Sequence, residues 1–262
     1  QDSDINPDTL FFDLNGLLHP MCRAAIKSIN ETQRQCSREE LEQLMLDKII
    51  DNIRKLIDLV NPSKLVYFSI DGSAPRAKMI QQRYRRFRSV LLKDTLQNIH
   101  NKYSDESTIE WDTNAITPGT LFLEKVSVRI REYIQEELRH QVETVVFSSQ
   151  RVPGEGEQKI MDYMRNHYQH KELTHCIYGL DADLIMLSIC SGISKIVLLR
   201  EAVHFGKIDI DSFLYLDIAV LSEKLLLEIR DNHIDDRLEM LTDKSLLFDY
   251  CIVMFFLGND FI

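Results

Sequence analysis

The sequence of 262 residues predicts an α/β fold, in which a mostly parallel sheet is flanked by helices. Two observations predict it. Short runs of β-branched and aromatic residues alternate with longer segments of helical periodicity, and acidic residues recur where the short runs end. Strands that alternate with helices form parallel sheets covered on both faces. Because no linker or repeat divides the chain, we expect one domain over residues 1–262.

Five apolar runs are the expected strands, and helical patterns lie between them. The strands are residues 10–14, 64–70, 142–148, 175–179 and 195–199. The helices are residues 38–60, 77–100, 117–140 and 156–168, and residues 211–257 are expected to form two more. The helix over 117–140 is expected to start with Thr117 as its N-cap, because Pro118 suits the first helical position.

The charge of the chain is acidic overall but uneven. A formal net charge of −10 by itself disfavours nucleic-acid binding, since such proteins are usually basic. A metal-dependent nuclease, however, must concentrate carboxylates, and bound cations reverse the local sign. Residues 76–88 hold six basic residues and no acidic one. The distribution of charge is therefore more informative than its total.

The spacing of the cysteines and the length of the apolar runs limit the class to which the protein can belong. The five cysteines include no CxxC pair, so neither a disulfide framework nor a zinc site is indicated, and a reducing compartment is expected. The longest apolar run, residues 250–257, is too short to span a membrane. The polar start shows no signal peptide. Because the first residue is not Met and the last follows a Gly-Asn-Asp turn abruptly, we expect a piece of a longer protein.

Acidic residues follow four of the expected strands. They are Asp13, Asp71, the pair Glu155 and Glu157, and the pair Asp181 and Asp183. Taken singly, each is more typical of a turn or a helix N-cap, and so is Asp260 in the Gly-Asn-Asp turn. Ligands of parallel sheets bind at the carboxyl ends of the strands. The recurrence of acids at that edge therefore favours a site over a set of caps.

Gathered carboxylates repel one another unless cations neutralise them. Mg²⁺ prefers oxygen ligands, so it suits a cluster of Asp and Glu. Two such ions can activate a water and stabilise the leaving oxygen of a phosphodiester. The sequence therefore predicts a nuclease site that uses Mg²⁺ or Mn²⁺, with two ions expected.

The basic stretch after Asp71 predicts a phosphate pocket. Four residues share one face of the expected helix: Lys78, Gln82, Arg85 and Arg86. Clustered cations with an amide donor suit a phosphate monoester, although a solvated basic face is the plain alternative. The other arginines, Arg76, Arg83 and Arg88, point elsewhere, toward backbone phosphates. A terminal-phosphate pocket beside a hydrolytic site favours an exonuclease acting on a 5′-monophosphate.

Seven motifs in this order resemble one known family. They are Phe12-Asp13-Leu14-Asn15-Gly16-Leu17-Leu18-His19, Ile70-Asp71-Gly72-Ser73-Ala74-Pro75-Arg76-Ala77-Lys78, Thr113-Asn114-Ala115-Ile116-Thr117-Pro118-Gly119-Thr120, Val152-Pro153-Gly154-Glu155-Gly156-Glu157, Tyr178-Gly179-Leu180-Asp181-Ala182-Asp183, Leu198-Leu199-Arg200-Glu201 and Phe255-Phe256-Leu257-Gly258-Asn259-Asp260-Phe261. Together they cover nearly the whole chain and resemble the XRN family of 5′→3′ exoribonucleases. The resemblance implies a PIN/FEN-like nuclease core and processive hydrolysis of single-stranded, 5′-monophosphorylated RNA to nucleoside 5′-monophosphates.

The resemblance also implies roles for single residues. Catalysis and binding of Mg²⁺ or Mn²⁺ fall to seven carboxylates: Asp13, Asp71, Glu155, Glu157, Asp181, Asp183 and Asp260. The 5′-phosphate pocket falls to Lys78, Gln82, Arg85 and Arg86. His19 stacks on a base, and Asn15 lies near the metal site. Without the resemblance, the position of His19 before Pro20 predicts a surface loop.

Two departures from the family pattern and two rival functions complete the expectations. The chain lacks the later helical portion with the aromatic that sandwiches the terminal base. It also lacks, after Ser188, the cysteine-bearing insert of nuclear members, so a cytoplasmic location is expected, with a nuclear one as the alternative. The rivals are a flap-type nuclease on the same core and a non-catalytic RNA-binding module. The basic helix disfavours the first and the retained carboxylates disfavour the second, whereas the oligomeric state is not predicted.

Overall fold

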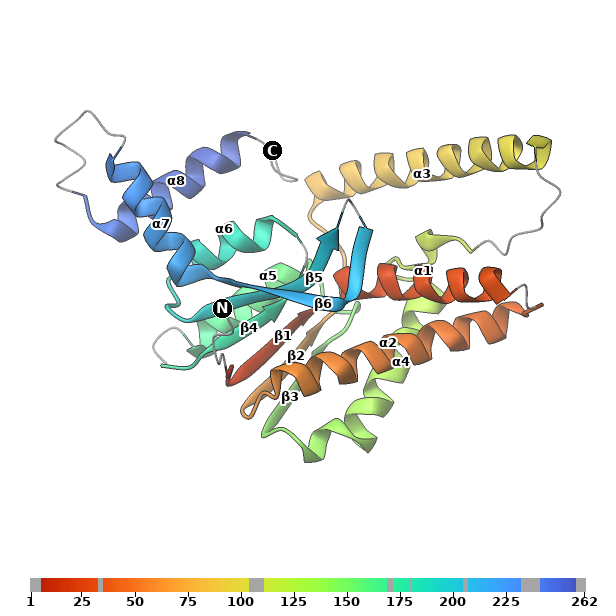
Figure 1. Cartoon of the computed structure of the whole chain (residues 1–262), viewed down its shortest axis with the longest axis horizontal. Coiled ribbons are helices and arrows are strands. Elements are labelled where there is room, and N and C mark those ends of the chain that lie inside the picture. The colour runs from red at the N-terminus through yellow and green to blue at the C-terminus, as the bar shows by residue number, and fades with distance from the viewer. Residues whose placement is uncertain are drawn as a thin grey trace.

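A six-stranded sheet lies at the centre of the described part of the chain, with helices packed around it (Figure 1). The computed structural model describes residues 6–32, 35–103, 111–168, 172–179, 181–204, 207–231 and 241–257. The strands are β1 (Thr9–Asp13), β2 (Leu65–Ser69), β3 (Thr144–Ser148), β4 (His175–Tyr178), β5 (Ile196–His204) and β6 (Lys207–Asp217), in the order β3-β2-β1-β4-β5-β6. Neighbours among β1 to β5 pair in parallel, and β6 pairs with β5 in antiparallel fashion. The predicted, mostly parallel sheet is thus confirmed.

Helices cover both faces of this sheet. They are α1 (Leu14–Thr32), α2 (Arg38–Val60), α3 (Arg76–Tyr103), α4 (Leu121–Glu136), α5 (Gly156–Tyr168), α6 (Asp183–Cys190), α7 (Ile218–Asp231) and α8 (Asp243–Leu257), with short 3₁₀ turns η1 (Thr113–Ala115) and η2 (Leu138–His140). Figure 1 shows that α3 extends beyond the sheet and its covering helices. Within the described ranges, no helix is long and apolar enough to cross a membrane.

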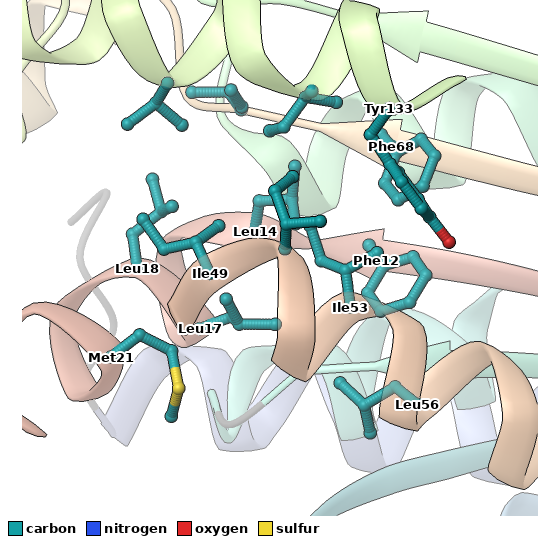
Figure 2. Close-up of a cluster of buried hydrophobic side chains, with 14 of the residues drawn as sticks. Phe12, Leu14, Leu17, Leu18, Met21, Ile49, Ile53, Leu56, Phe68 and Tyr133 are labelled. Carbon is teal, nitrogen blue, oxygen red and sulfur yellow. The ribbon is translucent and has the colours of Figure 1, made fainter. Parts of the chain in front are cut away.

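Alternation along the strands divides the core into two clusters. Successive strand residues point to opposite faces. Phe12 and Phe68 therefore enter a cluster with residues of α1, α2 and α4, such as Leu17 and Ile53 (Figure 2). Phe11 enters the other cluster, with residues of α5 and α6. Because both faces are covered, the central strands β1 and β2 are buried along their whole length and are mostly apolar.

Helix α1 has no counterpart among the expected helices. Its apolar residues at helical spacing, Leu17, Met21, Ala25 and Ile29 among them, are buried against the sheet and α2. Pro20 lies inside this helix, although proline normally disfavours a helix interior. The burial of the flanking apolar side chains offsets that cost. The prediction that His19 lies in a loop was therefore wrong.

Helix α4 begins three residues later than expected. The hydroxyl of Thr120, not Thr117, caps it by accepting a hydrogen bond from Leu123 N at 3.3 Å. Gly119 has φ +91°, a conformation that interrupts a helix just before that point. Thr117 as N-cap was therefore wrong. The expected helices over 38–60, 77–100 and 156–168 are confirmed, with ends shifted by a few residues at most.

Strand β6 occupies the start of the segment over residues 211–257, where only helices were expected. Residues 211–217 belong to β6, which pairs with β5 from Val197↔Asp217 onward. Pairing with a partner strand outweighs local propensity here. The two later helices are confirmed as α7 and α8.

Candidate active site

A cavity of about 550 Å³ lies at the carboxyl ends of the parallel strands. Six of the seven predicted carboxylates line it: Asp13, Asp71, Glu155, Glu157, Asp181 and Asp183. The rest of its wall includes Asn15, Lys78, Gln82 and Arg85. The seventh carboxylate, Asp260, lies outside the described residues. The sheet edge therefore gathers acids from four segments that are distant in sequence.

Each acid owes its position to the end of a strand or the start of a helix. Asp13 is the last residue of β1, and Asp71 follows β2 with one residue between them. Glu157 lies in the first turn of α5, directly after Gly156, and Asp183 begins α6. Asp181 is exposed. Strand-end geometry, read from the sequence, thus locates these side chains in space.

Asp13 is the most deeply buried acid of the cavity. Its side chain is 5% exposed, and among the residues that the structure describes nothing donates a hydrogen bond to Oδ1. Burial raises the pKa of Asp13 well above its usual range, and Asp71, Glu157 and Asp181 raise it further. A buried carboxylate oxygen without a donor is costly in water-free surroundings. A cation at this position removes the cost.

Asp71 is held by hydrogen bonds to both of its oxygens. Asn15 Nδ2 donates to Oδ2 at 2.8 Å, and Gly156 N donates to Oδ1 at 2.6 Å. Burial raises the pKa of Asp71, and the Gly156 bond opposes that rise. Asp71 is therefore fixed in orientation by α1 on one side and α5 on the other.

Two glycines permit the close approach of these segments. A Cβ at Gly156 would lie 2.5 Å from Asp13 Oδ1 and 3.4 Å from Asp71 Oδ1. A Cβ at Gly72 would lie 2.0 Å from the carbonyl oxygen of Val152. The distances of 2.5 Å and 2.0 Å are too short for a Cβ, so any other residue at these positions would force its neighbours to shift. The motifs around Asp71 and Glu155 therefore need glycine for packing.

Glu157 faces the other acids of the cavity. Burial raises its pKa to about 8, and repulsion from Asp183, Glu155 and Asp181 adds to the rise. Glu155 lies 3.5 Å from Lys78 Nζ, and both side chains are almost fully buried. Lys78 thus contacts the acidic cluster directly, at the start of the basic helix.

The donor set suits a hard divalent cation. In the described part of the chain, no three His, Cys, Asp or Glu side chains already stand at metal-binding spacing. Mg²⁺, however, keeps several waters and contacts few protein oxygens directly. Six carboxylates in the wall of a cavity of about 550 Å³, and an Asp13 Oδ1 that accepts no hydrogen bond from the described residues, fit such a hydrated ion. Asp13, Glu157 and Asp183 line this cavity and could hold the ion.

A second cavity, of about 180 Å³, adjoins the first. The two cavities share four lining residues: Asn15, Asp71, Gln82 and Arg85. The wall of the second cavity also includes His19, Arg86, Ser89, Thr113, Asn114 and Thr117. Arg86 donates to Gln82 Oε1 at 3.3 Å. Burial lowers the pKa of His19, and nearby Arg23 and Arg85 lower it further. The predicted phosphate pocket and the predicted stacking histidine thus lie together beside the acids.

Sequence reasoning missed several residues of this region. Thr113 and Asn114 entered only as part of a motif, although they line the second cavity. Lys159 was not singled out, yet its ammonium group is buried beneath Asp71. The feature that could have identified Lys159 is its position one helical turn after Gly156, on the buried side of α5.

Comparisons with known proteins agree with this picture. The family model described as XRN 5′-3′ exonuclease N-terminus matches residues 1–202. The 5′-3′ exoribonuclease 1 proteins of Saccharomyces cerevisiae and Schizosaccharomyces pombe are 34% and 35% identical, each over 97% of this chain and 17% and 20% of their own length. The 5′-3′ exoribonuclease 2 of Kluyveromyces lactis is 31% identical over 99% of this chain and 30% of its own length. The chain thus spans less than a third of these relatives.

Proposed function

Since the chain belongs to the XRN 5′-3′ exonuclease N-terminus family, we propose that it carries the site for metal-dependent 5′→3′ hydrolysis of RNA. The substrate is single-stranded RNA with a 5′-monophosphate, and the products are nucleoside 5′-monophosphates. Relatives named 5′-3′ exoribonuclease support the reaction class. The mostly parallel α/β sheet is consistent with a PIN-like nuclease core.

One observation carries the proposal: six carboxylates share a cavity with Lys78, Gln82 and Arg85. Acidic and basic side chains within one cavity suit a phosphodiester and a terminal phosphate, respectively. Gln82 and Arg85 also line the second cavity, beside His19. A 5′-phosphate bound there sets the scissile bond at a fixed distance from the acids, which yields mononucleotides.

Divalent cations are part of this proposal. Bound at the acidic wall, Mg²⁺ or Mn²⁺ supplies an activated water and charge neutralisation for the displaced oxygen. Asp13, Glu157, Asp181 and Asp183 line the space for two such ions, and Asp260 is proposed to complete the set. Asn15 and Gly156 orient Asp71. His19 stacks on a base of the RNA, and the protein acts in the cytoplasm.

The test compares one RNA sequence with three different 5′ ends. We expect rapid Mg²⁺-dependent release of mononucleotides from the 5′-monophosphate RNA, and little from RNA with a 5′-hydroxyl or a cap. Asp181→Ala is expected to abolish turnover and leave RNA binding measurable. Equal rates on all three ends would contradict the phosphate pocket, and full activity in EDTA would contradict the metal mechanism.

The two rival functions predict different results in the same assay. A flap-type nuclease cleaves branched DNA in preference to single-stranded RNA, and a binding module retains RNA without hydrolysing it. The basic helix supports the exoribonuclease over the first, because Lys78, Gln82 and Arg85 share the cavity with the acids and their side chains suit a terminal phosphate. The six gathered carboxylates favour it over the second.

A further inference from the structure

Lys159 places a cation inside the fold, next to the acidic cavity. It lies on α5, two residues after Glu157, and its side chain is 7% exposed. Its Nζ donates to Ile70 O at 2.8 Å and to Ser149 O at 3.1 Å. A lysine is rarely buried unless its ammonium group has fixed acceptors. The burial of Lys159 therefore indicates a specific structural role for its ammonium group.

The two acceptors come from neighbouring strand ends. Ile70 follows β2 and Ser149 follows β3. The strands pair through Ser69 and Ser148, and Ile70 N donates to Ser148 O at 3.0 Å. Lys159, on α5, adds a hydrogen bond to the next residue after each strand, Ile70 and Ser149. One ammonium group thus joins β2, β3 and α5 at the edge where the acids gather.

This junction lies directly beneath the acids. Ile70 immediately precedes Asp71, whose Oδ1 accepts from Gly156 N at 2.6 Å. Helix α5 is therefore bound to the end of β2 at two points, Gly156 to Asp71 and Lys159 to Ile70. Glu155 and Glu157 flank the first of these points. Repulsion between Glu157 on α5 and Asp13 on β1 acts to part α5 from the sheet, and the attraction between Lys159 and Asp71 opposes it.

We propose that Lys159 is a positioning residue that fixes the separation of Asp71 from Glu155 and Glu157, and so sets the affinity of the site for divalent cations. The role within catalysis rests on the proposed function, whereas the effect on cation affinity does not. Loss of the ammonium group leaves two buried carbonyls without that donor and relaxes the carboxylate spacing. Residues that orient metal ligands typically change affinity by about 10- to 100-fold when they are removed.

The test measures Mn²⁺ binding by calorimetry in Lys159→Met, which keeps the length of the side chain. Arg54→Met is the matched control, since Arg54 donates to Glu137 Oε2 at 2.8 Å from α2 and does not line the acidic cavity. We expect Lys159→Met to weaken Mn²⁺ binding about 10- to 100-fold. Arg54→Met is expected to lower the melting temperature and leave Mn²⁺ affinity within about twofold of the unmodified chain, because the partners of Arg54 (Asp51, Glu137 and the Tyr133 ring) do not line the acidic cavity.

Hydrolysis of 5′-monophosphate RNA gives a second readout. For Lys159→Met, raising the Mn²⁺ concentration is expected to restore most of the turnover. This is measured well below the melting temperature that the variant has without Mn²⁺, so that stabilisation of the fold by the bound ion does not account for the recovery. Unchanged Mn²⁺ affinity in Lys159→Met, or an equal loss in Arg54→Met, overturns the inference. Where Lys159→Met does not fold, Lys159→Gln keeps an uncharged NH₂ group with two N–H donors and is measured in the same way. If the unmodified chain binds Mn²⁺ but hydrolyses no RNA, the proposed function fails and the calorimetric comparison still decides the role of Lys159.

Discussion

Asn15 and Asp71 bind each other through two hydrogen bonds, although 56 residues separate them in sequence. Asn15 Nδ2 donates to Asp71 Oδ2 at 2.8 Å, and the main-chain N of Asp71 donates to Asn15 Oδ1 at 3.1 Å. The carboxamide therefore fixes both the carboxylate and the backbone of Asp71. It also ties the start of α1 to the end of β2.

The first prediction follows from this pair. Asn15→Ala is expected to lower kcat by about 10- to 100-fold, because a carboxylate without its orienting partner holds a cation poorly. RNA binding is expected to change little, since the basic helix is untouched. Single-turnover kinetics and a filter-binding titration on 5′-monophosphate RNA measure the two quantities separately.

Asn166→Ala is the control for that prediction. Asn166 is exposed on α5 and lies outside both cavities, so its removal is expected to leave kcat unchanged. An Asn15→Ala protein with normal kcat would mean that Gly156 alone is sufficient to orient Asp71.

The second prediction concerns selectivity for the 5′ end. Arg85→Ala is expected to reduce kcat/KM on 5′-monophosphate RNA by about 10- to 100-fold, because a hydrogen bond to a charged group contributes about 1.5–3 kcal/mol. The rate on 5′-hydroxyl RNA is expected to stay the same. Steady-state rates on the two RNAs measure the ratio directly.

Arg88→Ala is the matched control on the same helix. Arg88 is exposed three residues after Arg85 and lines neither cavity. Removal of this side chain is expected to weaken the binding of both RNAs equally, because it acts through general electrostatic attraction. This attraction decreases at higher salt concentration. If Arg88→Ala reproduces the selective loss, the basic helix binds RNA without a defined phosphate pocket.

The sequence predicted the acidic cavity well because its geometry follows from local rules. An acid directly after a buried parallel strand must lie at the carboxyl edge, whatever the packing elsewhere. Asp13 and Asp71 obey this rule, whereas Glu155 and Glu157 reach the same edge through the loop between β3 and α5. The gathering of six acids is therefore a consequence of strand order and strand ends.

Features that depend on tertiary contacts were not predictable in the same way. Pro20 signals a loop locally, and only the burial of Leu17 and Met21 against the sheet reveals a helix. Strand β6 forms because β5 offers an edge to pair with. Lys159 resembles any solvated lysine until the carbonyls of Ile70 and Ser149 are in view.

The third prediction tests the close contact of Gly156 with Asp13. In an ordinary helix, Gly→Ala stabilises by about 1 kcal/mol. Here the new Cβ would lie 2.5 Å from Asp13 Oδ1, so Gly156→Ala is expected to destabilise instead and to reduce activity strongly. Urea unfolding measures the free energy of unfolding.

A double-mutant cycle with Asp13→Ala isolates that contact. In the Asp13→Ala background the clash is absent, so Gly156→Ala is expected to cost much less or to stabilise. Additive effects of the two substitutions would show that the Gly156 Cβ position is not limited by Asp13, and that the backbone relaxes around it.

The fourth prediction concerns pH and the buried side chain of His175. His175 is 0% exposed, and its Nδ1 lies 2.8 Å from Thr9 Oγ1. Burial lowers its pKa from 6.5 to about 4, and Asp8 only partly opposes this. Because the folded-state pKa is below the unfolded one, the unfolded chain binds the proton more readily. The stabilisation is therefore complete above pH 6.5 and is lost as pH falls toward about 4.

His175→Gln separates this effect from the titration of carboxylates. Between about pH 7.5 and about pH 5, the unmodified chain is expected to lose about 2 kcal/mol more unfolding free energy than His175→Gln. Urea unfolding at both pH values, in the same salt, gives the difference. Asp8 and Tyr168 lie near the ring and are unchanged in both proteins. Parallel pH profiles would mean that His175 is protonated within the fold, with water reaching its Nε2.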